Sequence, residues 1–323
     1  MTFTLYPIKV FPIFKEKIWG GRKLNSFLKL PENKKIGEVW FFADQELNCS
    51  IVANGQYKGL KLNELMKKYS KEILGSELFK KYDNKFPLLF KFIDAEDKLS
   101  IQVHPDDEFA KKNNLPSGKS EVWYIVSSGK KSFVLLGLKK RINKNLLKKL
   151  IITGRITNYL MKYKTTPGDC YYIKGGTLHS IGPSNVIFEI QQNTDKTYRI
   201  FDWGRQNLEI SRELDIDNGI KAIRINNKPV INNKKSKSFL KIKKLFEPDK
   251  FVINELNIEK GKKCWYNHSG PFVISVFEGY ADMLWKQGKE KINKGEVVLV
   301  PFGIRDFTLY AKEKIKCLIT EIR

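Results

Sequence analysis

The 323-residue chain has no apolar run long enough to cross a bilayer, and no small-residue cleavage site follows its partly apolar start. We therefore expect a soluble protein with a mature N-terminus and no membrane partner. Cysteine is also scarce. The four cysteines are scattered and form no Cys-x-x-Cys pair, which argues against a zinc knuckle and a disulfide scaffold. This usage fits a reducing, cytoplasmic location.

Acidic residues are few beside the basic ones, since 35 Asp and Glu against 59 Lys and Arg leave a formal net charge of +24. Such an excess attracts polyanions, and nucleic acid is the first to consider. The lysines, however, occur as doublets along the whole chain, often beside Asn and Ile, which is typical of a solvated surface encoded by an A/T-rich genome. We therefore expect no nucleic-acid partner and a small anionic substrate such as a sugar phosphate.

Short strand patterns separated by Gly and Pro dominate the chain. Residues 36–54 have the composition of a strand followed by a turn, and 86–225 contain many short strands. Apolar residues at helical spacing predict helices at 57–82, interrupted at Gly75, and at 143–154. The pattern predicts a mainly β fold of the sandwich or barrel kind.

The strand pattern occurs twice. When Gly168 is aligned with Gly295, His179 falls opposite Asp306 at the same offset. The chain therefore resembles a duplicated β unit, in which the first copy keeps side chains that can bind a metal and the second has lost them.

A polar, irregular segment at 226–237 is the candidate linker between the copies. We predict a catalytic metal-binding domain at 1–230, which includes a helical segment at about 57–82, and a degenerate C-terminal β domain at 231–323.

Histidine is the scarcest candidate ligand, with three in the chain. In "DKLSIQVHPDD" the alternation of a strand places Ser100, Gln102 and His104 on one face. Gln102 and His104, together with Glu121 and His179, could form a metal site with an open position, suited to Zn, Co, Ni, Mn or Fe(II). By itself, a histidine before Pro-Asp-Asp is more typical of a turn or a helix cap.

Longer strings carry a family resemblance. "GDCYYIKGGTLHSI" matches the second motif of the cupin superfamily except at Lys174, where proline is usual. "WGGRKL", "IGEVWFFAD", "PLLFKFIDAEDKLSIQVHPDD", "GKSEVWYIV" and "EIQQNTDKTYRIFDWGR" resemble type I mannose-6-phosphate isomerases, particularly their short bacterial branch, over about residues 7–206. The resemblance implies two cupin-type units, which are double-stranded β-helix jelly rolls.

The resemblance also implies the site. It implies one metal ion per chain, usually zinc, with these ligands: Gln102, His104, Glu121 and His179. It implies a catalytic arginine and lysine, Arg199 and Lys119, and three substrate-pocket residues, Lys91, Ser100 and Trp19. Longer members carry a large helical insertion between the carboxylate ligand and the last histidine, and the interval here is too short for it. Other segments must supply those pocket walls.

The implied activity is the metal-dependent interconversion of mannose 6-phosphate and fructose 6-phosphate through an enediol, by a monomer or weak homodimer. Negative charge develops on oxygen, which a divalent ion and a fixed arginine would stabilise. The proton carrier stays open between a metal-bound water, Glu189, Asp195 and Lys119.

Two other functions fit part of the pattern. An Fe(II) dioxygenase would use the same jelly roll, but its sites usually supply three histidines, or two with a carboxylate, and here a Gln ligand with nearby lysine and arginine argues against it. A non-enzymatic binding module for sugar or nucleic acid would not require the histidines.

Several candidates also have purely structural interpretations. Arg199 could pair with Asp202 or Asp195, and Lys119 could be an ordinary surface lysine. Glu38 could serve to satisfy buried backbone groups rather than contact substrate.

Overall fold

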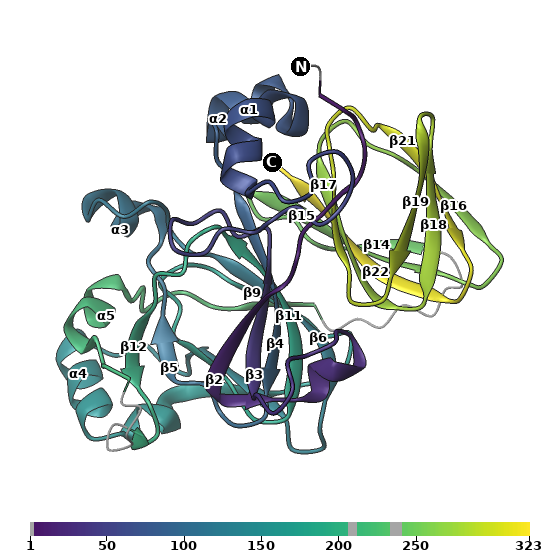
Figure 1. Ribbon diagram of the computed structural model, residues 1–323. Helices are drawn as coiled ribbons and strands as arrows, with labels where there is room; N and C mark the ends of the chain where they lie inside the picture. The colour runs from purple at the N-terminus through teal and green to yellow at the C-terminus, as the bar shows by residue number, and fades with distance from the viewer. Residues whose placement is uncertain (1–2, 206–211, 233–240) are drawn as a thin grey trace.

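The computed structural model describes residues 3–205, 212–232 and 241–323. Within these ranges the strands form four sheets, arranged as two jelly-roll units that lie side by side (Figure 1). The mainly β prediction is confirmed. Side chains of Ile125, Leu136 and Ile187 pack between the two sheets of the first unit and form the core that positions its strands.

The first unit contains a larger and a smaller sheet. The larger sheet contains, in spatial order, β13 (Val230–Asn232), β9 (Cys170–Ile173), β6 (Glu121–Ser128), β11 (Asn185–Gln192), β4 (Leu88–Ala95), β2 (Ile13–Gly21) and β3 (Ile36–Phe41). The smaller sheet contains β12 (Tyr198–Phe201), β5 (Ile101–Val103), β10 (His179–Ile181), β7 (Phe133–Leu138) and β8 (Leu160–Lys164).

The second unit repeats this plan. One sheet contains β1 (Ile8–Lys9), β20 (Val297–Val300), β17 (Phe272–Glu278), β22 (Ile315–Ile322), β15 (Phe251–Ile258) and β14 (Lys241–Phe246). The other contains β16 (Lys263–Asn267), β21 (Asp306–Ala311), β18 (Tyr280–Trp285) and β19 (Gly288–Asn293). Asp306 begins β21 as His179 begins β10, which agrees with the predicted duplication.

The helices lie outside the sheets. They are η1 (Lys23–Ser26), α1 (Leu62–Leu74), α2 (Ser76–Tyr82), α3 (Asp107–Lys112), α4 (Lys144–Ile152), η2 (Arg155–Tyr159) and α5 (Ile216–Ala222). The predicted helical segment at 57–82 is confirmed, although its first helix begins only at Leu62. Gly75 separates α1 from α2 because its φ of 83° breaks the helix.

The predicted linker is wrong in part. Val230–Asn232 form β13, which pairs with β9 at the edge of the larger sheet, and 233–237 fall outside the described residues. The short Val-Ile pair becomes a strand only because an edge is available, with Pro229 just before it where no ladder hydrogen bond is needed. Near the N-terminus, β1 pairs with β20 of the second unit. The division into 1–230 and 231–323 stays a prediction.

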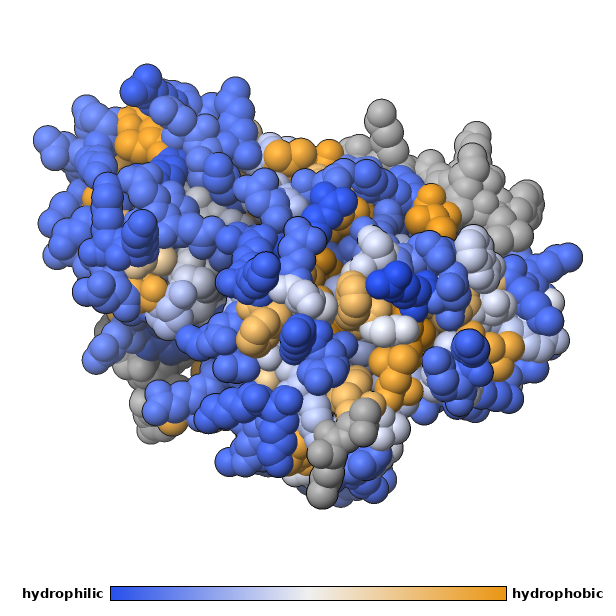
Figure 2. Space-filling model, turned by 90° about the horizontal axis from the view of Figure 1, so that it is seen from above, coloured by the Kyte–Doolittle hydropathy of each residue, from blue (hydrophilic) through white to orange (hydrophobic). Residues whose placement is uncertain are grey.

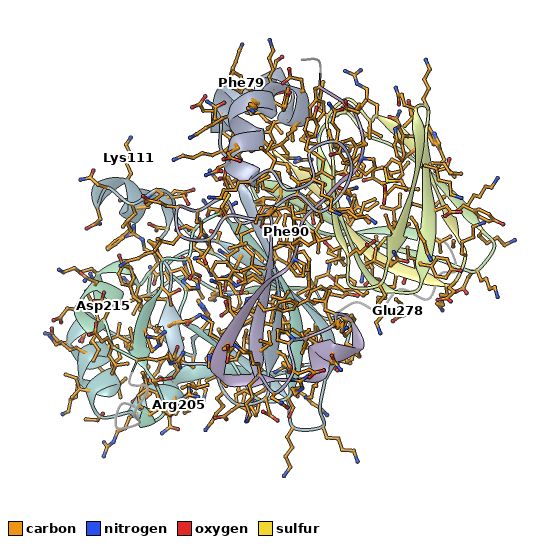
Figure 3. The ribbon with its side chains drawn as sticks, viewed as in Figure 1. Phe79, Phe90, Lys111, Arg205, Asp215 and Glu278 are labelled. Atoms are coloured by element: carbon orange, nitrogen blue, oxygen red, sulfur yellow. The ribbon has the colours of Figure 1, made fainter. Side chains whose placement is uncertain are left out.

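The two units share a large apolar interface. Phe90 lies near the middle of it (Figure 3), in a cluster that joins residues of both units. Phe92 of β4 packs edge-on against Phe277 of β17, with ring centroids 6.0 Å apart. Interfaces of this apolar kind hold domains in one orientation.

The face of the molecule seen from above is mainly hydrophilic. Figure 2 shows hydrophobic residues scattered singly or in small groups on this face. Among the described helices, none has both the length and the hydrophobicity needed to span a bilayer.

Candidate active site

Three predicted site residues lie in one row across the smaller sheet. His179 on β10 and Arg199 on β12 both lie opposite Gln102 on the central strand β5. Ser100 Oγ lies 3.3 Å from Gln102 Oε1, and His104 follows β5 directly. The alternation of one strand and the register of its two neighbours therefore bring these side chains to one end of the sheet.

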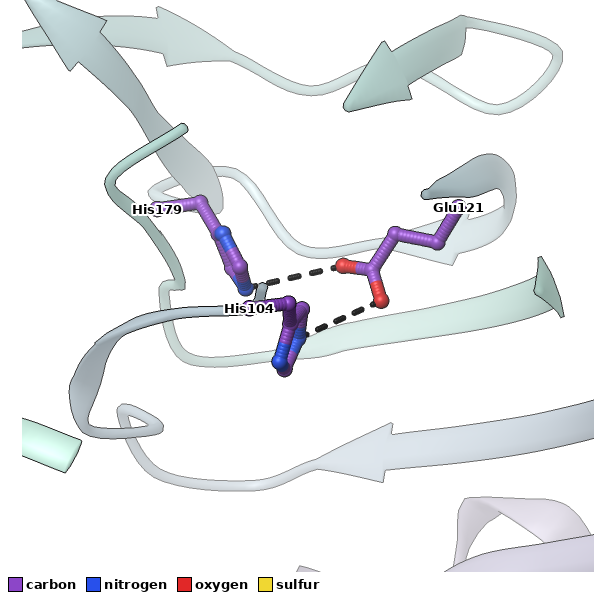
Figure 4. A group of neighbouring side chains, drawn as sticks. All are labelled: His104, Glu121 and His179. Atoms are coloured by element: carbon purple, nitrogen blue, oxygen red, sulfur yellow. Dashed lines mark ion pairs between the residues drawn. The ribbon is translucent and has the colours of Figure 1, made fainter. Parts of the chain in front are cut away.

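The imidazoles of His104 and His179 and the carboxylate of Glu121 lie close together between the larger and the smaller sheet of the first unit (Figure 4). Glu121 begins β6 in the larger sheet and faces the smaller one. Its Oε2 lies 3.4 Å from His104 Nε2, and its Oε1 lies 3.5 Å from His179 Nε2. All three side chains are almost completely buried.

In both imidazoles, the Nδ1 atom, which faces away from Glu121, is hydrogen-bonded to a backbone carbonyl. His104 Nδ1 lies 3.1 Å from Lys196 O, and His179 Nδ1 lies 2.9 Å from Thr177 O. Because a carbonyl only accepts, Nδ1 carries the proton and the lone pair of Nε2 points toward Glu121. Burial lowers the pKa of His104 to about 3, with Lys119 acting in the same direction, and burial also lowers that of His179. Both rings are therefore neutral at pH 7.

This arrangement fits a divalent metal ion. Three buried groups point lone pairs at one another, and Glu121 Oε1 has no hydrogen-bond partner among the described residues. Such a cluster requires a cation. In the structure Lys119 supplies one, since its Nζ lies 2.9 Å from His104 Nε2 and contacts Glu121 Oε2. Burial acts to raise the pKa of Glu121, but the ammonium group of Lys119 holds it well below its usual range.

The amide of Gln102 is oriented with its nitrogen toward the cluster. Gln102 Nε2 lies 3.2 Å from His179 Nε2, and its oxygen faces Ser100. Turning the amide over would present the oxygen to a metal. The predicted role of Gln102 as the fourth ligand remains a proposal.

Lys119 is buried, so its interpretation as a surface lysine is wrong. The strand does not extend to it, because β6 begins at Glu121. Its backbone N–H instead donates to Pro105 O at 2.8 Å, and its side chain points inward to His104 Nε2.

A cavity of about 240 Å³ opens beside the cluster and is lined by most of the predicted residues. These are Trp19, Lys91, Ser100, Gln102, His104, Lys119 and Arg199. Its walls come from β2, β3, β4, β5, β6, β10, β11 and β12, so strands of both sheets of the first unit form the cavity.

Two cations of the cavity differ in their surroundings. Lys91 is buried between Glu189, at 3.5 Å, and Asp195, at 3.3 Å. Burial acts to lower the pKa of Lys91, but these two carboxylates raise it above its usual range. For Arg199, burial and the neighbouring Arg212 lower the pKa, and its Nε has no hydrogen-bond partner among the described residues. Arg199 is therefore the cation left for an anionic ligand.

The structural alternative for Arg199 is wrong. Asp202 is paired instead with Arg205, at 2.6 Å, and Arg212, at 2.7 Å, and Asp195 is paired with Lys91, at 3.3 Å. Arg199 donates from Nη1 to the backbone oxygen of Glu213 at 3.1 Å.

Comparison with known proteins identifies the family. The model of the type I phosphomannose isomerase catalytic domain matches residues 8–127. Mannose-6-phosphate isomerase ManA of Bacillus subtilis is 33% identical over 99% of this chain and all of its own length. The chain belongs to the type I phosphomannose isomerase family.

Solved structures agree with this assignment. The crystal structure of the mannose 6-phosphate isomerase from Bacillus subtilis superposes with a TM-score of 0.87 at 30% identity, and the match covers 98% of this chain and 99% of that one. A zinc-bound mannose 6-phosphate isomerase shares the fold, with a TM-score of 0.77 at 15% identity over 98% of this chain and 99% of that one.

Other residues line the same cavity and were not predicted as substrate contacts. They are Lys17, Glu38, Ile93, Leu99, Trp123, Ile181, Glu189, Asp195, Thr197 and Arg212. Lys17 lies two residues before Trp19 on β2, so strand alternation alone could have predicted it. Arg212 comes from a segment without a recognisable pattern, and no sequence signal points to it.

Glu38 does not serve backbone groups as expected. Its carboxylate accepts from Trp40 Nε1 at 2.7 Å and lies 3.5 Å from Lys17 Nζ, with the side chain facing the cavity. The interpretation of Glu38 as a backbone partner is therefore wrong.

The two carboxylates named as proton carriers have opposite environments. Burial raises the pKa of Glu189, and the charge of Glu121 raises it further. Burial also acts to raise the pKa of Asp195, but Lys91 and Lys119 hold it below its usual range. Trp123 Nε1 donates to Glu189 Oε2 at 2.8 Å and fixes that carboxyl in the cavity wall.

Proposed function

We propose that this protein is a metal-dependent aldose–ketose isomerase that interconverts mannose 6-phosphate and fructose 6-phosphate. The observation that carries the proposal is the buried His104, Glu121 and His179 cluster, which opens onto a cavity with an unpaired arginine. A sugar phosphate needs both a site for its reacting oxygens and a cation for its charge.

The metal is zinc, one ion per chain, and its ligands are Gln102, His104, Glu121 and His179. When bound, it polarises the sugar oxygens that carry the developing negative charge. The carbonyls of Lys196 and Thr177 support this assignment because they hold both imidazoles in the neutral form that binds metals.

Lysine and arginine orient the substrate. Arg199 and Lys91 reach the cavity from opposite sheets, and Lys119 lines the same cavity beside His104 and Glu121. An arginine fork and ammonium groups suit a phosphate or an enediolate. Ser100 and Trp19 line the same cavity and position the sugar.

Glu189 carries the proton between the two carbons of the reacting bond. A carboxyl with a raised pKa accepts and returns a proton near neutral pH more effectively than one whose pKa is lowered, which favours Glu189 over Asp195. Lys119 is less suited because Glu121 already binds its ammonium group.

We further propose that the protein is cytoplasmic and acts as a monomer or weak homodimer without nucleic acid or membrane. All four cysteines are free, which supports a reducing compartment.

A coupled assay tests the function. The metal-loaded protein should convert mannose 6-phosphate to fructose 6-phosphate, lose this turnover on chelation, and regain it when zinc is added back. Absence of turnover in protein that contains stoichiometric zinc would refute the proposal.

A further inference from the structure

A second cationic groove lies away from the active-site cavity, beside α4 and α5, which are neighbours at one edge of the first unit (Figure 1). The groove has a volume of about 510 Å³. Five basic side chains line it, together with one acidic side chain: Arg141, Lys144, Lys174, Lys221, Arg224 and Asp106.

Asp106, the acidic side chain that lines the groove, already forms an ion pair with Arg224. Arg224 forms a bidentate pair with the carboxylate of Asp106. Its Nε lies 2.6 Å from Asp106 Oδ2, and its Nη2 lies 3.1 Å from Asp106 Oδ1. No carboxylate of the described residues lies within 4.0 Å of the charged groups of Lys144, Lys174 or Lys221, and the same holds for Arg141. Four cations from three segments therefore line one groove without an ion-pair partner in the described ranges.

The frame beneath these cations is held by hydrogen bonds. Arg224 N donates to Gly176 O at 2.8 Å, and Gly176 N donates to His104 O at 2.7 Å. Asn227 Nδ2 donates to Gly175 O at 2.9 Å. The groove is thus formed before any ligand arrives, which lowers the entropic cost of binding.

Lys174 is the residue at which the chain departs from the cupin motif, and it is exposed at this groove. Its neighbour Lys221 comes from the last turn of α5. Without a ligand the cations repel one another, and an anion with several charges in a short run would relieve this repulsion.

We propose that this groove binds an oligophosphate, a run of at least three linked phosphates, either free or as the tail of a nucleotide. A single phosphate would leave most of the four cations unpaired. Arginine and lysine both suit phosphate oxygens. None of the lining residues is aromatic, so the groove lacks the stacking surface that single-stranded nucleic acid uses.

The test is calorimetric titration of the metal-loaded, full-length protein with tripolyphosphate and, separately, with a nucleoside triphosphate. Both should bind, and binding should weaken as the salt concentration rises, because the cations are exposed. The double variant Lys174→Gln with Lys221→Gln should bind tripolyphosphate about tenfold or more weakly.

A matched control is Lys260→Gln with Lys262→Gln. These two exposed lysines flank Gly261 between β15 and β16 in the second unit, and their loss removes the same charge. This control should keep the affinity of the unmodified protein. Extraction of metal by the anion would be equal in both double variants, so it cannot produce the difference.

Three results would overturn the proposal. Equal weakening in both double variants would show attraction by net charge alone. Loss of binding in Arg199→Gln, with binding retained in Lys174→Gln and Lys221→Gln, would place the anion in the active-site cavity. Binding of duplex DNA but not of tripolyphosphate would make the groove a nucleic-acid surface. None of these measurements depends on turnover, so the proposed isomerase activity and this site can fail separately.

Discussion

His179 lies directly opposite Gln102 across the antiparallel pair of β10 and β5, with His179 Nε2 3.2 Å from Gln102 Nε2. Arg199 lies opposite Gln102 on the other side. Gln102, a proposed metal ligand, therefore lies between His179, another proposed ligand, and Arg199, the proposed substrate-binding arginine. Each of the two is one strand away from Gln102, a distance of about 5 Å. This spacing lets one sugar phosphate reach both.

Removal of either ligand histidine should abolish metal binding and turnover together. In His104→Gln or His179→Gln we expect metal affinity to fall at least about 100-fold, since even outer contacts of a metal site contribute 10–100-fold. Metal content by mass spectrometry and the coupled assay check this. His268→Gln removes the chain's third histidine, which lies in the second unit, and should change neither. Turnover by metal-free His104→Gln would contradict the assignment.

Replacement of the proposed proton carrier should slow the chemical step and leave the metal in place. We expect Glu189→Gln to lower kcat by about 10²–10⁴-fold with little change in KM, because an amide keeps the contact with Trp123 but cannot take the proton. Steady-state kinetics with metal analysis is the measurement. Asp195→Asn is the comparison, and a larger loss of kcat in that variant would favour Asp195 as the carrier.

Loss of the unpaired arginine should weaken substrate binding. Arg199→Gln should lower kcat/KM for mannose 6-phosphate by about 10-fold or more while the metal content stays unchanged. Arg155→Gln on η2 removes the same charge from an exposed position outside the cavity and should behave like the unmodified protein. If both variants lose activity equally, Arg199 acts only through net charge.

The third histidine should make stability depend on pH. His268 Nε2 lies 3.1 Å from Glu321 Oε2, and although burial opposes it, the hydrogen bond to Glu321 raises the pKa of His268 in the folded protein. The folded state therefore binds this proton more tightly than the unfolded chain does. The ion pair between His268 and Glu321 contributes about 1 kcal/mol to the free energy of unfolding. This contribution is complete below the pKa of histidine in the unfolded chain, about 6.5, and is lost as the pH rises through the pKa of His268 in the folded protein.

Denaturant unfolding of the unmodified protein and of His268→Gln at several pH values checks this. The difference between their free energies of unfolding should be larger at pH 6 than at pH 9. At lower pH it should shrink again as Glu321 is protonated, since the pKa of that carboxyl is lowered in the fold. A difference that does not vary with pH would exclude the ion pair as its source.

Local patterns were enough to predict much of the fold and part of the site. Strand alternation placed Ser100, Gln102 and His104 on one face because side-chain direction in a strand depends only on position. The interruption at Gly75 was readable because only glycine adopts a φ of 83° without strain. Glu121 and His179 came from family motifs rather than from spacing.

Other features depend on which strands become neighbours, and no local pattern contains that information. β13 exists because β9 offers an edge, and β1 pairs with a strand almost three hundred residues away. The inward position of Lys119 depends on its backbone contact with Pro105, and Arg212 reaches the cavity from a segment without a pattern.

The sequence by itself determined the chemical types available: imidazoles, a carboxylate, and cations in excess over acids. Only the tertiary structure decided which of the cations stay unpaired. Lys91 lies between two carboxylates, whereas no carboxylate of the described residues forms an ion pair with Arg199 or with Arg141, Lys144, Lys174 and Lys221 of the groove beside α4. The reason is physical, because pairing depends on distances between side chains from remote strands, and these distances are set when the sheets pack.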